Sequence, residues 1–237
     1  MLLDPLREDL QSLPSLTDAA LLESLRTRHA ACSVYTFSGP KVVVSVNPFD
    51  WAVSLPLYSE EVRAKFQLAP EGDLSGGRRS LPPHLYAVGE QARRRRAEGL
   101  PQALVVGGES GAGKTEAVKI LLQYLCQASG KSSAMAAGGG TLVDRLIELN
   151  PLLESFGNAT TALNHNSSRF GKLITLQYER AASAEGAAAA HIVGARISSY
   201  LLETVRVVHH AEGEAAFHIF YQLLAGVDQS EAQRLRL

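Results

Sequence analysis

The feature that most constrains this chain is a glycine-rich run, GESGAGKT, at Gly108–Thr115. The run matches the pattern GxxxxGK[ST] at every fixed position. Glycines let the backbone adopt positive φ and bring N–H groups against phosphate oxygens, and a helix that follows adds partial positive charge. The run therefore predicts a phosphate-binding loop, in which Lys114 reaches the β- and γ-phosphates and the Thr115 hydroxyl ligates Mg²⁺.

The sequence around this loop predicts the strand and the helix that such a loop needs. The apolar run QALVV at residues 102–106 predicts a short strand, and EAVKILLQYLCQ predicts an amphipathic helix. This context favours a phosphate loop over a simple glycine-rich turn. The residues expected to bind phosphate are Gly108, Glu109, Ser110, Gly111, Ala112, Gly113, Lys114 and Thr115. The loop alone leaves transport, signalling, kinase and motor functions open.

The first hundred residues carry further helix and strand signals. Leucines at helical spacing within residues 1–30, interrupted at Pro14, predict two short helices. The β-branched run at residues 42–46 predicts a strand buried on both faces. Residues 51–80 are expected to be mostly irregular, and a helix is expected to follow Pro82-Pro83.

That helix ends in four consecutive arginines, Arg93–Arg96, which allow two interpretations. They could contact nucleic acid or a phosphoinositide, or they could form a solvated helix end. Cations complement the carbonyl end of the helix dipole, so the second interpretation is favoured. The formal net charge of -1 also provides no global field that would attract nucleic acid or an anionic membrane.

The C-terminal half predicts helices and strands in alternation. A helix at residues 142–156 should kink or divide at Pro151, and strands are expected at residues 172–179 and 191–202. The low-complexity tip at residues 181–190 joins these strands, and a helix at residues 215–225 and a polar tail follow. Interleaved strands and helices predict an α/β sandwich around a largely buried sheet.

The composition predicts an ordinary soluble globular protein, with 46% hydrophobic and 20% charged residues. Cys32 and Cys126 have no CxxC spacing, which favours two free thiols in a reducing compartment. The acidic N-terminus is unlike a signal peptide, and no apolar run is long enough for a membrane span. A cytoplasmic location is therefore expected.

A second polar cluster, NHNSSRFGKLITLQYE, begins at Asn164. Its hydroxyls, amides and arginine suit a loop that closes over a γ-phosphate and its metal, although a polar turn before a strand explains them equally well.

The two motifs together resemble the phosphate loop and switch I of myosins. YTFSG, NPF, LPPHLYAVGEQA, LESFGNATT, ISSYLLETVRVV and FHIFYQLLAG resemble the same family over nearly the whole chain. A kinesin-like motor is the nearest alternative, but Glu109, Ala112 and the Phe170–Lys172 run are more similar to myosin.

The resemblance implies the P-loop NTPase fold of the myosin motor head, here as an α/β fold with an incomplete mixed or parallel sheet flanked by helices. It divides this partial motor domain into four segments. These are the N-terminal helices and lead-in (1–40), the adenine-pocket strand and P-loop unit (41–128), a flexible surface loop (129–140), and switch I with the following strands and helix (141–237).

The resemblance also implies roles for individual residues in binding ATP and Mg²⁺. Asn47, Pro48 and Tyr58 would line the adenine pocket. Asn164 and Ser167 would contact the phosphates, Ser168 would join Thr115 on Mg²⁺, and Arg169 would form a salt bridge that reports closure. Lys114, Ser167 and Arg169 would serve catalysis, with Lys114 neutralising charge as the γ-phosphate leaves.

The family's switch II, a DxxGFE-like segment, does not occur in this sequence. The only DxxG, Asp73–Gly76, precedes the phosphate loop and is interpreted as a turn. Arg169 is therefore expected to lack its family partner.

Two functions remain open. The chain is part of an actin-based ATPase motor at the cytoskeleton, or it is a truncated module that binds nucleotide without cycling. Actin filaments are the implied partner, with light chains only in a full-length protein, and the chain alone is expected to show weak or no actin-activated ATPase.

Overall fold

A computed structural model describes residues 7–75, 80–128, 142–180 and 190–237. The described chain divides into two compact units. The first comprises residues 7–75, 80–107 and 112–128, and the second comprises residues 108–111, 142–180 and 191–237. The expected flexible loop at residues 129–140 and most of the tip at 181–190 lie outside the described residues.

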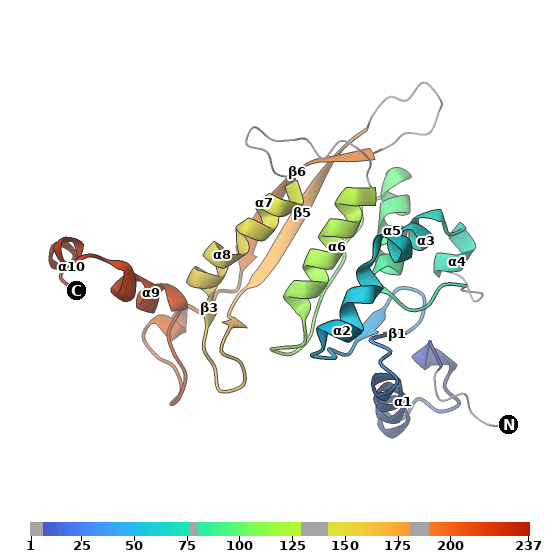
Figure 1. Cartoon of the computed structure of the whole chain (residues 1–237), viewed down its shortest axis with the longest axis horizontal. Coiled ribbons are helices and arrows are strands. Elements are labelled where there is room, and N and C mark those ends of the chain that lie inside the picture. The colour runs from blue at the N-terminus through green and yellow to red at the C-terminus, as the bar shows by residue number, and fades with distance from the viewer. Residues whose placement is uncertain (1–6, 76–79, 129–141, 181–189) are drawn as a thin grey trace. The chain divides into compact units, whose positions relative to one another are not determined.

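The first unit is mainly helical (Figure 1). Its elements are η1 (Leu10–Ser12), α1 (Asp18–Ala30), β1 (Tyr35–Phe37), β2 (Val43–Ser45), α2 (Trp51–Ser54), η2 (Leu55–Tyr58), α3 (Glu60–Leu68), α4 (Glu71–Ser75), α5 (Leu85–Ala97) and α6 (Lys114–Ala128). The helix predicted after Pro82-Pro83 and the helix predicted after the phosphate loop are confirmed as α5 and α6.

The prediction that residues 51–80 are mostly irregular is wrong, because α2, η2, α3 and α4 occupy most of them. The Asp50 carboxylate accepts a hydrogen bond from the Ala52 N–H at 2.8 Å, and the Ser59 hydroxyl accepts one from the Val62 N–H at 3.4 Å. Both are N-caps, which satisfy donors that a helix start leaves free. Pro56 lies in the first turn of η2, where a missing N–H costs nothing.

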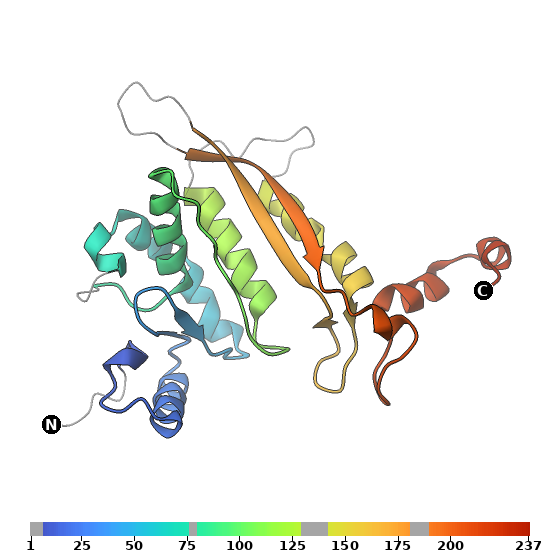
Figure 2. The same ribbon diagram turned by 180° about the vertical axis from the view of Figure 1, so that it is seen from behind.

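The core of the first unit lies where α5 packs against α6, and Figures 1 and 2 both show these helices side by side. The rings of Tyr86 and Tyr124 stack with centroids 4.5 Å apart. A Cβ added at Gly89 would lie 3.0 Å from the Tyr124 ring, so glycine permits this close approach. Phe66 from α3, 1% exposed, completes the apolar centre.

His84 lies in the same core and caps α5, since its Nδ1 accepts a hydrogen bond from the Tyr86 N–H at 3.0 Å. Its ring lies against those of Tyr86, Tyr35 and Phe66, with centroids 4.4, 5.0 and 5.2 Å away. Burial lowers the pKa of His84 to about 4, against a smaller opposing effect of the Leu57 carbonyl. The folded protein therefore holds this ring neutral.

Acidification is expected to weaken the first unit through His84. Between pH 6.5 and about 4 the unfolded chain binds a proton on this ring and the folded chain does not, so stability falls as pH is lowered. The loss should reach about 1.5 kcal/mol between pH 6.5 and 5. Urea unfolding at several pH values measures it. His84→Asn keeps a side-chain acceptor for the helix cap but has no group that binds a proton in this pH range. If the unfolding free energy of this variant fell as steeply with decreasing pH as that of the native chain, the assignment to His84 would be contradicted.

Glu90 on α5 is a fully buried carboxylate with three donors around it. Arg93 donates to it at 2.8 and 2.6 Å, Arg94 at 2.7 Å, and the Tyr124 hydroxyl of α6 at 2.9 Å. Burial alone raises the pKa of Glu90, but these donors outweigh it and hold the pKa below its usual value. The interpretation of Arg93–Arg96 as a solvated helix end is therefore wrong for Arg93 and Arg94, which neutralise a buried charge.

The sequence predicts a single, largely buried sheet, and this prediction is wrong for the described residues. They form three two-stranded sheets instead. β1 and β2 are antiparallel, with Phe37 opposite Val43. The strand predicted at residues 42–46 is three residues long and only half buried. The strand predicted at residues 102–106 has no ladder, and Val105 is 94% exposed. An apolar run becomes a strand only beside a partner strand, and the described chain places none there.

The second unit combines two long strands with short helices (Figure 2). Its elements are α7 (Leu142–Glu148), α8 (Asn150–Gly157), β3 (Asn158–Ala159), β4 (Ser167–Ser168), β5 (Gly171–Arg180), β6 (Ala190–Tyr200), η3 (Thr204–Val207), α9 (His218–Gly226) and α10 (Gln229–Leu235). β5 and β6 are hydrogen-bonded neighbours and run in opposite directions in Figure 2.

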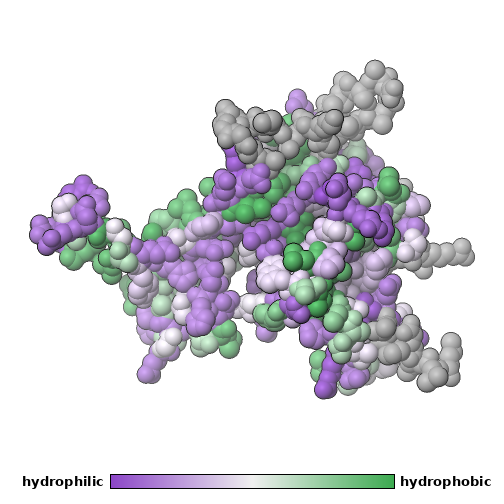
Figure 3. Space-filling view, viewed as in Figure 1, coloured by the Kyte–Doolittle hydropathy of each residue, from purple (hydrophilic) through white to green (hydrophobic). Residues whose placement is uncertain are grey.

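The sequence predictions for this unit are largely confirmed. The helix expected at residues 142–156 divides at Leu149, and Pro151 occupies the first turn of α8. Both predicted strands and the predicted helix near residues 215–225 are present, while the polar tail forms α10. Figure 3 shows hydrophilic side chains over α10 and a mixture of hydrophobic and hydrophilic ones over α8 and α9. No described helix is long and apolar enough to cross a membrane.

Candidate functional site: a phosphate loop and a switch segment

The phosphate loop Gly108–Thr115 has the backbone conformation that its glycines predict. Gly111 and Gly113 adopt φ of 82° and 91°, in the left-handed region that residues with a Cβ avoid. Helix α6 begins at Lys114, directly after the second of these glycines. The turn therefore directs the loop into a helix N-terminus, the arrangement that binds phosphate oxygens.

Ser110 connects the loop to the segment that begins at Asn164. The Asn164 side-chain amide donates to the Ser110 hydroxyl at 2.8 Å, and that hydroxyl donates to the Ser167 hydroxyl at 3.3 Å. All three residues belong to the second unit. The structure thus brings together the two motifs whose chemistry suggested a shared role.

The segment Asn164–Arg169, called the switch segment below, is held by a short antiparallel pairing. β4 pairs with β3, with Asn158 opposite Ser168 and Ala159 opposite Ser167. The Arg169 N–H donates to the Gly157 carbonyl at 2.8 Å and continues this attachment past the strand. Ser167 is 3% exposed and Ser168 is exposed, so the two serines differ in what they can reach.

Arg169 has a carboxylate partner within this chain, although that partner is not the switch II residue that the family resemblance implies. Its Nε lies 2.5 Å from the Glu203 carboxylate, and one terminal nitrogen donates to the Ser167 hydroxyl at 3.3 Å. Glu203 is not part of a DxxGFE-like segment and lies in the stretch between β6 and η3. Arg169 is therefore ion-paired within this chain although the sequence contains no DxxGFE-like segment.

Glu203 also belongs to a longer network of ion pairs, which joins Arg169, Glu203, Arg206 and Glu214. Arg206, 5% exposed, donates to Glu203 at 2.8 Å and to Glu214 at 2.9 Å. The hydrogen bonds from Arg169 and then Arg206 lower the pKa of Glu203 to about 2, and that from Arg206 lowers the pKa of Glu214. Two arginines and two carboxylates therefore remain charged together and balance one another.

The predicted adenine-pocket residues line one hollow of the first unit, with a volume of about 280 Å³. Its walls include Asn47, Pro48 and Tyr58 as well as Ala112 and Gly113 of the phosphate loop. A Cβ on Gly113 would lie 3.8 Å from the Asn47 side-chain nitrogen, so the loop and the predicted adenine contact are neighbours. The fit to a nucleotide base beside a phosphate loop is therefore good.

The further residues of this hollow, which the sequence analysis did not assign to the site, include Tyr35, Trp51 and Glu116. The Tyr35 and Tyr58 hydroxyls are 2.5 Å apart, and burial raises the pKa of both above the usual range. Glu116 lies in the first turn of α6 and pairs with Lys119 at 3.2 Å. The position of Glu116, two residues after Lys114, was a usable signal, whereas Tyr35 was noted only as part of the YTFSG run and not as a pocket residue.

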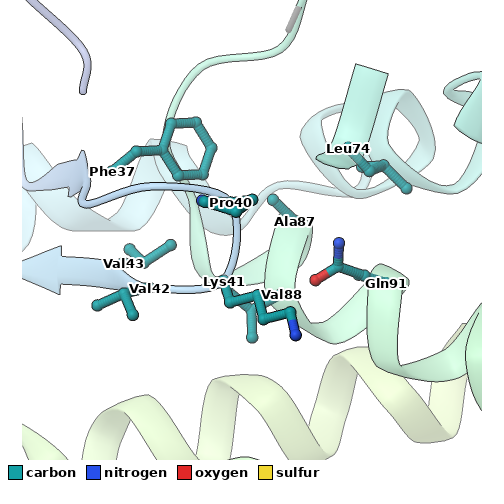
Figure 4. Close-up of a pocket in the computed structure, with 9 residues that line it drawn as sticks. All are labelled: Phe37, Pro40, Lys41, Val42, Val43, Leu74, Ala87, Val88 and Gln91. Carbon is teal, nitrogen blue, oxygen red and sulfur yellow. The ribbon is translucent and has the colours of Figure 1, made fainter. Parts of the chain in front are cut away.

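A second hollow of the first unit, shown in Figure 4, is too narrow to admit a water molecule. Mostly hydrocarbon side chains surround it, with Lys41 and Gln91 as its polar members. It shares no residue with the nucleotide candidates and has no set of converging polar groups, so we assign it no ligand.

Comparison with known proteins decides which family carries this arrangement. The family model described as the myosin head (motor domain) matches residues 7–237. The chain belongs to the myosin motor-domain family.

Its relatives include myosins from distant organisms. The chain is 41% identical over 235 residues to the myosin ID heavy chain of Dictyostelium discoideum, covering 97% of this chain and 19% of the relative. It is 43% identical over 222 residues to the unconventional myosin-Ic of Bos taurus, covering 93% and 19%. Myosin-1 of Saccharomyces cerevisiae is 40% identical over 242 residues, covering 97% and 12%. This myosin-family chain thus spans a fifth or less of the length of these relatives.

The residues predicted to bind the γ-phosphate and Mg²⁺ lie in both units of this myosin-family chain. Lys114 and Thr115 are the first two residues of α6, with Lys114 half-buried and Thr115 exposed. They belong to the first unit and Ser168 belongs to the second, so a shared Mg²⁺ site stays a prediction. Among the described residues no group of three or more His, Cys, Asp and Glu side chains could hold a metal ion.

Proposed function

We propose that this chain is the ATP-binding portion of an actin-based cytoskeletal motor that couples hydrolysis of Mg·ATP to movement on actin filaments. Membership of the myosin motor-domain family over residues 7–237 supports the motor part of the proposal. Actin filaments would then be the partner and the cytoplasmic cytoskeleton the place of action. Light chains would bind only to segments of a longer protein.

One observation carries the nucleotide part of the proposal: the phosphate loop turns through Gly111 and Gly113 into the N-terminus of α6 while Asn164 and Ser167 bind its Ser110. In an NTPase the loop backbone and a lysine hold the phosphates, and neutral hydroxyls and amides from a second segment complete the cradle. The two segments in contact here have these residue types.

Each residue then has a role in the proposed site. Gly108–Gly113 would offer backbone N–H groups to the phosphates, with Lys114 as the cation. Asn164 and Ser167 would donate to phosphate oxygens, and Thr115 with Ser168 would hold Mg²⁺. Asn47, Pro48 and Tyr58 would hold the adenine. Bound Mg²⁺ would neutralise charge on the β- and γ-phosphates, and the chain's own contribution is positioning and electrostatic stabilisation.

Lys114→Ala tests the phosphate loop. We expect Mg·ATP affinity to fall at least about tenfold, because the phosphates lose their fixed cation. Trp51, the sole tryptophan of the chain, lines the proposed adenine hollow, so its fluorescence can follow binding. Lys65→Ala on α3 removes the same charge from an exposed position and is the matched control. Equal affinity of the Lys114 variant and the control would contradict the assignment.

A nucleotide-binding module that does not cycle is the second candidate function. Its support is that Arg169 already has a carboxylate, Glu203, within this chain, so the switch segment is held without a DxxGFE-like segment. Steady-state ATP turnover with increasing actin filaments separates the candidates. Turnover that rises with actin supports a motor activity of the chain itself, and nucleotide binding with flat turnover supports the module.

A further inference from the structure

We propose that Glu203 is a positioning residue, which holds Arg169 and through it fixes the Ser167 hydroxyl against Ser110 of the phosphate loop. The inference rests on the proposed nucleotide site and adds a residue to it. Its starting point is a continuous set of polar contacts within the second unit, running from Ser110 to Glu214.

The contacts at Arg169 show why its position depends on Glu203. The Nε–carboxylate distance is 2.5 Å, whereas the contact from Arg169 to the Ser167 hydroxyl is 3.3 Å. The bond to Glu203 joins two opposite charges at the shorter distance, whereas Ser167 offers a neutral hydroxyl, so Glu203 sets where the guanidinium lies. The weaker contact to Ser167 then follows from the placement of Arg169.

Backbone contacts bring Glu203 to Arg169 independently of the side chains. The Glu203 N–H donates to the Arg169 carbonyl at 3.0 Å, so the two residues are joined twice. Because Glu203 lies 34 positions after Arg169, this double attachment connects the switch segment to the chain that leaves β6. A surface ion pair without such support contributes little to order.

Arg206 fixes Glu203 in turn. Its side chain is 5% exposed, bonds Glu203 and Glu214, and also donates to the Ala215 carbonyl at 3.1 Å. A buried guanidinium needs compensating carboxylates, so Arg206 keeps the Glu203 side chain in place. The switch arginine is thus held by a carboxylate that is itself held, which is how a second layer of contacts orients a functional side chain.

The geometry also supplies a matched control. Glu203 and Glu214 both pair with Arg206, but only Glu203 pairs with Arg169. Glu203→Gln and Glu214→Gln remove the same charge from the same guanidinium, and in each variant the other carboxylate still compensates Arg206. A difference between them therefore reports on Arg169 and not on the buried arginine.

Hydrogen–deuterium exchange of the full chain without nucleotide tests the positioning. We expect exchange in residues 164–170 to rise about tenfold in Glu203→Gln and in Arg169→Gln, and to stay at the native rate in Glu214→Gln. The double variant Glu203→Gln with Arg169→Gln should exchange no faster than either single variant, because each substitution already removes the same ion pair between Arg169 and Glu203. Unchanged exchange in Glu203→Gln, or effects that add in the double variant, would overturn the proposal.

Arg169→Gln leaves the pairs of Arg206 intact, so it keeps the test decisive if Glu203→Gln folds poorly. The Mg·ATP affinity gives the functional readout, with a loss of about three- to tenfold expected for Glu203→Gln and none for Glu214→Gln. Equal affinities of these two variants would also overturn the positioning role. If the native chain binds no Mg·ATP, the proposed function fails, while the exchange experiment still decides whether Glu203 positions the switch segment.

Discussion

Arg94→Ala is expected to lower the free energy of unfolding of the first unit by about 3–4 kcal/mol. Arg94 bonds the buried Glu90 carboxylate at 2.7 Å and also the carbonyls of Ala69 and Gln67, at 2.6 and 3.2 Å. Its removal leaves Arg93 as the remaining cation on a carboxylate with no exposed surface. Removing one partner of a buried ion pair destabilises the protein by more than the pair stabilises it, because the other charge stays buried without compensation.

Arg95→Ala is the matched control for this prediction. The two arginines are neighbours on α5 and carry the same charge and the same helix propensity. Urea unfolding followed by the fluorescence of Trp51, which lies in the first unit, measures both variants. Equal unfolding free energies would show that the Glu90 cluster does not stabilise the packing of α5 on α6.

The Glu90 cluster also shows what a local sequence pattern leaves out. Four arginines at a helix end were best explained by the helix dipole, and the spacing from Glu90 to Arg93 and Arg94 is ordinary for a helix surface. The pattern does not reveal that Tyr124 of α6 covers this carboxylate. Burial comes from a second helix, so a prediction from one helix cannot assign it.

The phosphate loop was predictable because its chemistry is local. The loop needs a left-handed backbone at Gly111 and Gly113, which glycine adopts without strain, and the helix begins at the next residue. The switch segment was recognisable for the same reason, as its hydroxyls and amides lie within six residues. Its partner Glu203 was not, because a contact between residues 34 positions apart depends on where β5 and β6 lead the chain.

The sheet was the least predictable part of the fold. The β-branched run at residues 42–46 predicts a buried strand and the apolar run at residues 102–106 predicts a short strand, yet the first forms a strand of three residues and the second forms none. Strand propensity describes how a side chain fits a pleated surface, and that surface exists only when neighbouring strands are present. By contrast, the missed helices α2 and α3 carried caps, Asp50 and Ser59, that were visible in the sequence.

Gly157→Ala is expected to destabilise the second unit by about 2–3 kcal/mol and to weaken Mg·ATP binding. Gly157 is the last residue of α8, and a Cβ there would lie 2.3 and 2.4 Å from two carbons of the Phe170 ring. Carbon atoms cannot approach so closely, so the ring or the helix end must move. The Gly157 carbonyl also accepts from the Arg169 N–H at 2.8 Å, so the displacement reaches the switch segment directly.

Gly226→Ala separates this clash from the general effect of alanine at a helix end. Gly226 is the last residue of α9 in the same unit, and a Cβ there would meet no atom within 4 Å. Thermal unfolding by circular dichroism, hydrogen exchange in β3 and β4, and Mg·ATP affinity compare the two variants. If both behave alike, the contact of Gly157 with Phe170 does not hold the switch segment. If only Gly157→Ala loosens β3 and β4, the packing at the end of α8 sets the position from which Ser167 and Arg169 act, because Ser167 belongs to that two-residue pairing and Arg169 directly follows it.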